Sequence, residues 1–349
     1  MHIHESAFFG AFLLFFIVVL LIDLGLFNRK SHTVGFREAC IWLGIWISLA
    51  LGFYLFLYFS GDVLHGVQDS VHLEKITSLY RQDIAMSGNF AQDITSYNHH
   101  IALEFLTGYL IEYALSVDNV FVMIMIFMSF RIAPKYYKRV LFWGILGAVI
   151  MRFLFIFISS ALLQEFSWVM FVFGGLLIFT GIRMLFHKEK EGILDTSGHP
   201  VVKIASKYFR VDRSYSGHRF FLRKDGKLML TPLFLVLMVI EFSDVIFAVD
   251  SVPAIFSVTQ DPFIVFFSNM FAIIGLRSLF FIVMGVIDTF HYLKTGLGVL
   301  LFVIGLKMIF AEWLKEVGFG TEHSLMIIGV ILGLSILASL IFPKKKQAN

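Results

Sequence analysis

Long apolar segments recur along almost the entire chain, and they restrict its fold more than any other feature. A helix of about 20 apolar residues is long enough to cross a bilayer. Nine such segments lie near residues 8–27, 38–60, 101–128, 139–163, 167–186, 229–256, 262–286, 295–312 and 322–342. Only 15% of the residues are charged, against about 25% in soluble domains. We therefore predict an all-α polytopic membrane protein with nine transmembrane helices.

Positive charges between these segments alternate between the two sides of the membrane. Arg29 and Lys30, the 131–139 cluster, the basic 188–228 segment and the 344–346 tail all fall on one side of a nine-helix arrangement. Cytoplasmic loops are rich in lysine and arginine, so we expect the N-terminus outside and the C-terminus in the cytoplasm. The first helix has its positive cluster behind it, which predicts a retained helix and not a cleaved signal peptide.

Two parts of the chain correspond in sequence. The motif IEYALSVDNVFV, from Ile111, matches EFSDVIFAVDSVPAIF, from Glu241, and a helix with a single arginine follows each motif. A third helix of each part shares GGLLIFTGIRMLF, from Gly174, with GVLLFVIGLKMIF, from Gly298. Each unit has three helices, an odd number, so helices 3–5 are expected to be inverted relative to helices 6–8. Inverted repeats are typical of secondary transporters, which bind ions where the repeats meet.

The predicted boundaries follow from this arrangement. We expect an N-terminal two-helix segment at 1–60, an extracytoplasmic loop at 61–100, a first repeat at 101–187, a basic cytoplasmic loop at 188–228, a second repeat at 229–312, and a C-terminal helix with a basic tail at 313–349. The basic loop is expected to set the topology and to attract anionic headgroups. Membrane lipids are therefore expected partners.

Acidic residues inside the apolar segments are the main functional signal. Five carboxylates lie there, namely Glu112, Asp118, Glu241, Asp244 and Asp250. An aspartate near the middle of a membrane helix costs about 2.5–3.5 kcal/mol, so each must be protonated, paired or bound to a cation. Arg152 and Arg277 are expected to be structural or gating partners that neutralise two of the five. The remaining three predict ion or proton binding.

The donor atoms of the two motifs indicate which ions would bind. Backbone carbonyls and further side chains can supplement the carboxylates, namely Ser116, Asn119, Ser243 and Ser251. Hard oxygen donors suit Mn²⁺, Mg²⁺ or Ca²⁺, whereas zinc and copper favour the cysteine and histidine that both motifs lack.

The spacing of the carboxylates restricts how they share ions. A separation of six residues places Glu112 and Asp118 about 120° apart on an unbroken helix. Either different neighbours complete each site, or the helix unwinds between the two acids. Pro253 favours unwinding in the second motif because it cannot donate to the Val249 carbonyl.

Together with the DLGLFNRK segment from Asp23, the two motifs resemble the TerC family, which is associated with tellurium resistance and manganese handling within the LysE transporter superfamily. The resemblance covers nearly the whole chain. It implies an inner-membrane protein that exports Mn²⁺ as the transported ion and holds no permanently bound cofactor. The ion site that it implies consists of Glu112, Asp118, Asn119, Glu241, Asp244 and Asp250.

We accordingly expect a secondary transporter, not an enzyme, that exports Mn²⁺ in exchange for protons. Moving a divalent ion against an inside-negative potential costs about 4.6 kcal/mol per 100 mV, and returning protons can offset that cost. No phosphate-binding loop is present to support an ATP-driven pump, and no feature indicates nucleic-acid binding. Some relatives resemble membrane assembly or metallation factors, which deliver metal to exported proteins. That alternative, and a homo-oligomer or membrane assembly partners, stay open.

Overall fold

The computed structural model describes residues 3–23, 35–82, 84, 86–166, 168–186, 202, 207, 209–211, 219–224, 227–286, 292–319 and 321–342. Most of the basic 188–228 segment, the Arg29–Lys30 cluster and the 344–346 tail lie outside these residues. The side chains of Asp23 and Asp118 also lie outside the described part, although their backbones end α1 and lie within α4, respectively.

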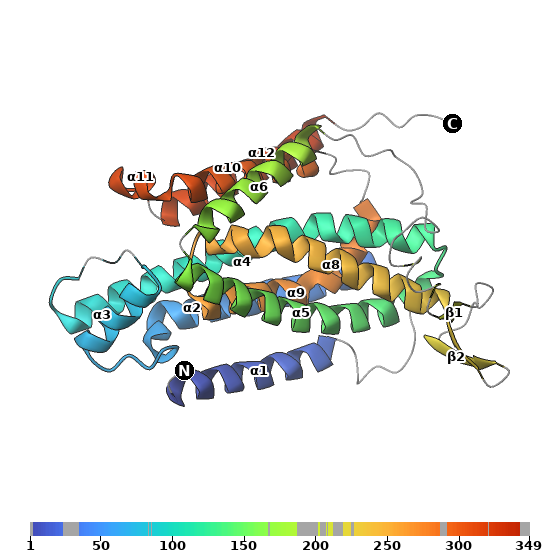
Figure 1. The fold of residues 1–349 in the computed structure, drawn as a ribbon, viewed down its shortest axis with the longest axis horizontal. Coiled ribbons are helices and arrows are strands. Elements are labelled where there is room, and N and C mark those ends of the chain that lie inside the picture. Colours follow the sequence, from blue (N-terminus) through green and yellow to red (C-terminus); the bar gives the residue numbers. More distant parts are fainter. Residues whose placement is uncertain are drawn as a thin grey trace.

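Helices dominate the described structure (Figure 1). The long ones are α1 (Ile3–Asp23), α2 (Phe36–Ser60), α4 (Phe90–Ser129), α5 (Tyr137–Glu165), α6 (Val169–Phe186), α8 (Pro232–Phe256), α9 (Pro262–Val286), α10 (Leu293–Ile309) and α12 (Thr321–Ile341). The short ones are η1 (Gly61–Val63), α3 (Ser70–Leu79), η2 (Pro134–Tyr136) and α11 (Ala311–Glu316). The predicted all-α polytopic class is confirmed.

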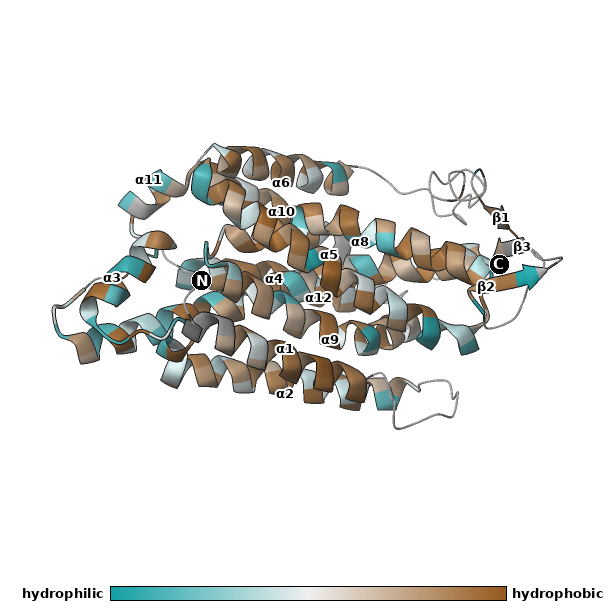
Figure 2. Cartoon of the chain, turned by 60° about the horizontal axis from the view of Figure 1, so that its bottom comes forward, coloured by the Kyte–Doolittle hydropathy of each residue, from teal (hydrophilic) through white to brown (hydrophobic). Residues whose placement is uncertain are grey.

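Seven of the described helices are long and apolar enough to cross a membrane. Two shorter apolar helices, at Ala7–Ile22 and Thr295–Ile309, coincide with the remaining predicted segments. Figure 2 shows that the long helices are mainly hydrophobic, whereas polar residues gather around α3 and the strands. The chain is thus a multi-pass membrane protein, and the number of spans stays a prediction.

The connections lie at two ends of the bundle. One end carries η1 and α3, and we call it the α3 end (Figure 1). The other carries a small sheet in the order β1-β3-β2, formed by β1 (Arg210–Val211), β2 (Phe221–Lys224) and β3 (Lys227–Leu230), and we call it the sheet end. The charge pattern predicts that the sheet end faces the cytoplasm.

Two segments that were expected to be loops contain regular structure. The helix expected to begin at 101 begins at Phe90, because Asn89 caps it by accepting a hydrogen bond from the Ala91 amide at 3.1 Å. Its first turns are polar, so a search for apolar segments does not detect them. The sheet likewise extends to Leu230, and α8 begins at Pro232, after the Thr231 cap.

The second motif helix does not unwind. α8 is continuous from Pro232 to Phe256 and includes Pro253. This proline removes only the hydrogen bond to the Val249 carbonyl, near the end of the helix. For Asp244 and Asp250, the corresponding acids six residues apart, the structure shows the alternative in which different neighbours surround each acid.

The helices form two layers (Figure 1). The core layer consists of α2, α4, α5, α8 and α9, and α1 packs against α9. The second layer consists of α6, α10 and α12, with α6 and α10 packed most closely. The two motif helices, α4 and α8, both belong to the core layer.

Glycines allow the backbones of α6 and α10 to touch. A Cβ added at Gly174 would lie 3.0 Å from the Gly305 carbonyl oxygen, and one at Gly181 would lie 2.7 Å from that of Gly298. The contacts are reciprocal, since a Cβ at Gly305 would lie 2.7 Å from the Gly174 oxygen. A twofold axis relates contacts in this way, and the sequence comparison pairs Gly174 with Gly298 and Gly181 with Gly305. The glycine contacts therefore support the predicted inverted repeat.

We predict that Gly181→Ala destabilises the protein by about 1–3 kcal/mol, because the new methyl group overlaps backbone atoms that cannot change rotamer. Gly175→Ala is the matched control, since nothing lies within 4 Å of a Cβ there and alanine favours a helix by about 1 kcal/mol. Thermal unfolding of both variants in detergent tests this. Equal unfolding temperatures would contradict the close α6–α10 packing.

Candidate functional site

Four polar side chains from four helices meet inside the core layer. Glu112 comes from α4, Arg152 from α5, Asp244 from α8 and Asn269 from α9. Their exposed fractions are 0%, 1%, 2% and 0%, respectively. This buried cluster brings together one carboxylate from each motif.

One guanidinium bridges the two motif carboxylates. Arg152 Nε donates to Asp244 Oδ2 at 3.3 Å, and its Nη2 donates to Oδ1 at 3.1 Å. Its Nη1 donates to Glu112 Oε1 and, at 2.9 Å, to Asn269 Oδ1. Asn269 Nδ2 in turn donates to Glu112 Oε2 at 3.1 Å. Arg152 thus pairs with two acids, whereas one acid for each arginine was expected.

Antiparallel packing of α4 and α8 brings the two acids within reach of one side chain. α4 and α8 run in opposite directions, because Glu104 contacts Thr259 while Gly108, one turn further along α4, faces Ile255. A Cβ at Gly108 would lie 3.0 Å from the Ile255 side chain, so the glycine allows close approach. This register places Glu112 level with Ser251, so Asp244 lies about two turns nearer the sheet end, and the long Arg152 side chain of α5 bridges the two acids.

The charges of the cluster are nearly balanced. A guanidinium keeps its proton in proteins, so Arg152 offsets only one of the two carboxylates when both are ionised. Arg277, 7% exposed, lines a small cavity of about 10 Å³ together with Asp244. It brings a second positive charge close to the cluster, consistent with its predicted role as a charge partner.

Asp250, the last acid of the α8 motif, faces a different direction from Asp244. Asp250 Oδ1 accepts a hydrogen bond from Thr180 Oγ1 of α6 at 3.0 Å, and Asp250 interacts electrostatically with Arg183 of the same helix. This orientation follows from its separation of about 120° from Asp244 on a continuous helix. Asp250 thus connects the core layer to the second layer.

Glu241 lies against α5, one turn from Asp244 toward the sheet end. A Cβ at Gly147 would overlap its carboxylate, so the glycine provides the space that Glu241 occupies. No hydrogen-bond donor reaches Glu241 from the part of the chain that the structure describes. This half-buried acid is therefore available to bind a cation.

Several buried polar atoms near the motif acids lack hydrogen-bond partners among the described residues. They are the Asn119 amide nitrogen and the hydroxyls of Ser116 and Ser251. Spacings of four and seven residues place Ser116 and Asn119 on the same face of α4 as Glu112. Buried polar groups are normally paired, so these atoms indicate space for water or an ion.

The predicted metal ligands are distributed over several places. Glu112 and Asp244 share the cluster, Glu241 lies toward the sheet end, and Asp250 faces α6. Within the described ranges, no three His, Cys, Asp or Glu side chains are close enough to hold one metal ion. The structure therefore distributes these residues over separate places in the core layer, with Arg152 between the two most buried acids.

The family model described as integral membrane protein TerC family matches residues 97–347. The chain belongs to the TerC family. All of the predicted site residues of this TerC-family protein fall inside the matched range, and α1 and α2 precede it. The family resemblance of the two motifs is confirmed.

Relatives of this TerC-family chain are also named as membrane proteins. It is 40% identical over 332 residues to an uncharacterized membrane protein of Myxococcus xanthus, covering 95% of this chain and 91% of that protein. It is 40% identical over 306 residues to Alx of Escherichia coli K12, named for a proposed role as a membrane-bound redox modulator, covering 87% and 86%. The chloroplast thylakoid membrane protein TERC of Arabidopsis thaliana is 42% identical over 241 residues, covering 68% and 61%. No solved structure matches the chain.

The sequence pattern of this TerC-family protein did not reveal Asn269 or the His65–Asp261 pair. Asn269 was overlooked because it is a single uncharged polar residue in an apolar helix. At the α3 end, His65 and Asp261 form a fully buried pair, with Nε2 and Oδ2 at 2.8 Å. Neither residue belongs to a motif, and Asp261 lies between the predicted 229–256 and 262–286 segments. A buried pair between residues so distant in sequence depends on the fold and has no local signal.

Proposed function

We propose that this protein is a secondary transporter that exports Mn²⁺, or a related divalent cation, across the inner membrane in exchange for protons. The observation that carries this proposal is the buried cluster, in which a single arginine bridges Glu112 and Asp244. Ionisable residues inside membrane segments are costly and mark ion and proton routes. The buried polar atoms of Ser116, Asn119 and Ser251, which have no hydrogen-bond partner among the described residues, support the same interpretation.

Arg152 and a divalent metal ion would compete for the same two carboxylates. A divalent ion can offset both carboxylates, whereas the guanidinium offsets one and cannot lose its proton. A metal ion that binds Glu112 and Asp244 must therefore displace Arg152. Protonation of the two acids weakens their hold on the metal, so protons can expel it, and Arg152 pairs with the acids again when the protons leave.

Two further motif acids, Glu241 and Asp250, have roles in ion entry and in the movement of the layers. Glu241 lies toward the sheet end, the predicted cytoplasmic side, and so offers an entering ion its first carboxylate. Asp250 binds Thr180 across the two layers at 3.0 Å. A change in its charge would alter the contact between the layers. Movement of the second layer against the core layer would then provide alternating access, as in transporters built from inverted repeats.

The purified wild-type protein in proteoliposomes tests the proposal. We expect radioactive Mn²⁺ to accumulate in vesicles whose interior is more acidic than the bath. A gradient of one pH unit supplies about 1.4 kcal/mol per proton, so exchange of two protons per ion, one for each acid, allows about 100-fold accumulation. A protonophore should abolish the accumulation, and competition by Ca²⁺ and Mg²⁺ measures selectivity.

The alternative class makes a different prediction for the same preparation. A metallation factor would bind Mn²⁺ without moving it and would deliver it to exported proteins captured by the 61–100 or 188–228 segment. Binding without flux therefore supports that alternative. Neither binding nor flux would contradict both functions.

A further inference from the structure

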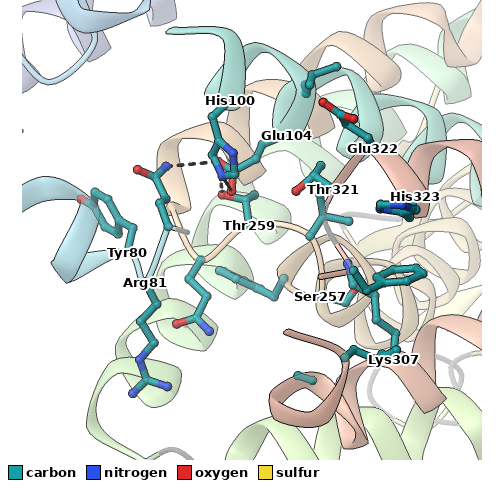
Figure 3. Close-up of a pocket in the computed structure, with 18 of the residues that line it drawn as sticks. Tyr80, Arg81, His100, Glu104, Ser257, Thr259, Lys307, Thr321, Glu322 and His323 are labelled. Atoms are coloured by element: carbon teal, nitrogen blue, oxygen red, sulfur yellow. Dashed lines mark hydrogen bonds and ion pairs between the residues drawn. The ribbon is translucent and has the colours of Figure 1, made fainter. Parts of the chain in front are cut away.

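A cavity of about 420 Å³ lies at the α3 end, between the core layer and the second layer. Figure 3 shows side chains from α4, the α8–α9 turn, α10 and the start of α12 around it. Exposed residues such as Arg81, Glu322 and His323 lie at its mouth, so the cavity reaches the surface. None of the predicted site residues lines it.

Glu104 forms part of the inner wall of this cavity, and its side chain is almost completely buried, with 2% exposed. Its Oε2 accepts hydrogen bonds from Thr259 Oγ1 at 2.9 Å and from Gln82 Nε2 at 3.2 Å. Its Oε1 lies 3.3 Å from His100 Nε2 (Figure 3). The His100 side chain is 22% exposed, so the pair joins a buried acid to a base that water can reach.

Charged and titratable groups surround Glu104 from every neighbouring element. They are Tyr97 and His100 of α4, Lys307 of α10, Asp261 of the α8–α9 turn with its partner His65, and Tyr80, Arg81, Glu322 and His323 along the cavity. Tyr97 is fully buried and interacts electrostatically with Glu104 and Asp261. Its hydroxyl has no hydrogen-bond partner among the described residues, which marks a place for water beside the two acids.

Polar side chains lie between Glu104 and the buried cluster. Eight residues separate Glu104 from Glu112, a rise of about 12 Å along α4. Midway between them, a Cβ at Gly108 would lie 3.0 Å from the hydroxyl of the buried Ser268. The next residue, Asn269, donates to Glu112 at 3.1 Å.

The chemistry of this cavity suits a proton better than a divalent metal ion. No three metal-binding side chains converge there within the described residues. Lys307 lines the cavity and interacts with Glu104, and its positive charge opposes a divalent cation. A proton needs only one acceptor and a short chain of hydrogen-bonding groups.

We propose that Glu104 is the proton-binding group at the α3 end, which exchanges protons with cavity water through His100 and passes them toward Glu112. This role rests on the proposed proton exchange and adds a site outside both motifs. It predicts that Glu104 is needed for coupling to protons and is not needed for metal binding at the cluster.

Two transport modes separate these roles in Glu104→Gln proteoliposomes. We expect Mn²⁺ accumulation driven by a pH gradient to fall by about 100-fold, as for loss of a proton-transfer group. Exchange of radioactive for unlabelled Mn²⁺ without a gradient needs no proton transfer and should keep its wild-type rate. Glu322→Gln is the matched control, because Glu322 is exposed at the mouth of the same cavity, and both modes should stay at wild-type rates.

The outcomes are distinguishable. Gradient-driven accumulation that survives in Glu104→Gln overturns the proposal, and so does loss of both modes, which indicates a structural role. Loss of both modes in the wild type contradicts the proposed function instead. If Glu104→Gln does not fold, His100→Gln replaces it. Slower driven accumulation with intact exchange supports the proposal, and wild-type rates in both modes refute it.

Discussion

Arg152→Met is expected to lose most of its folded protein. The substitution leaves Glu112 and Asp244, 0% and 2% exposed, without the guanidinium that bridges them. Removing one partner from a buried ion pair costs about 3–5 kcal/mol, a large share of the stability of a typical protein. The yield of a monodisperse peak after detergent extraction, with the unfolding temperature, measures the effect.

Two companion variants show whether buried charge is the cause. Arg37→Met removes an exposed arginine and should behave like the wild type. The triple variant Arg152→Met, Glu112→Gln, Asp244→Asn also removes the two negative charges and should regain much of the stability, since neutral replacement of a whole buried ion cluster is often tolerated. Equal stability of Arg152→Met and the wild type would show that other groups hold the two acids.

Asp244→Asn is expected to remain folded and to lose Mn²⁺ flux. The asparagine keeps an oxygen that accepts from Arg152, while Glu112 still provides a negative charge for the guanidinium. Loss of a group that hydrogen-bonds to a metal ligand lowers metal affinity or activity by about 10–100-fold, so loss of a carboxylate ligand itself should cost at least as much. Gradient-driven uptake and gradient-free Mn²⁺ exchange should both fall, unlike the expected result for Glu104→Gln.

Asp69→Asn is a suitable control for the same chemical change. Asp69 caps α3 by accepting from the His72 amide at 2.7 Å, and asparagine can cap equally well. Its flux should match the wild type. If Asp244→Asn transports Mn²⁺ at the wild-type rate, Asp244 is a structural partner of Arg152 and the ion binds elsewhere.

The positions of the helices were largely predictable, because a membrane segment must be long and apolar throughout. Each of the nine predicted segments overlaps one observed long helix. The start of α4 was missed for the same physical reason, since the turns after Phe90 project beyond the apolar segment and carry residues such as Asp93 and Asn98. Hydropathy locates the apolar stretch of a helix and not its full length.

The candidate site was only partly predictable. The angular separation of Asp244 and Asp250 follows from helix geometry, and the structure shows them facing different neighbours. Which neighbours they face depends on how α5, α6 and α9 pack around α8, and no local pattern encodes that. Asn269 and Glu104 therefore became visible only in the fold, although both contact acidic or polar partners far away in the chain.

The glycine contacts between α6 and α10 restrict how this sequence can evolve. When two side chains collide, a smaller residue at the second position can relieve the collision. At Gly174 and Gly181 the opposing atoms include the carbonyl oxygens of Gly305 and Gly298, which every amino acid has. No substitution of the opposing residue removes a carbonyl oxygen. A compensating substitution on the opposite helix therefore cannot make room for a larger residue at Gly174 or Gly181. Each of these positions must keep a small residue for as long as the two helices touch.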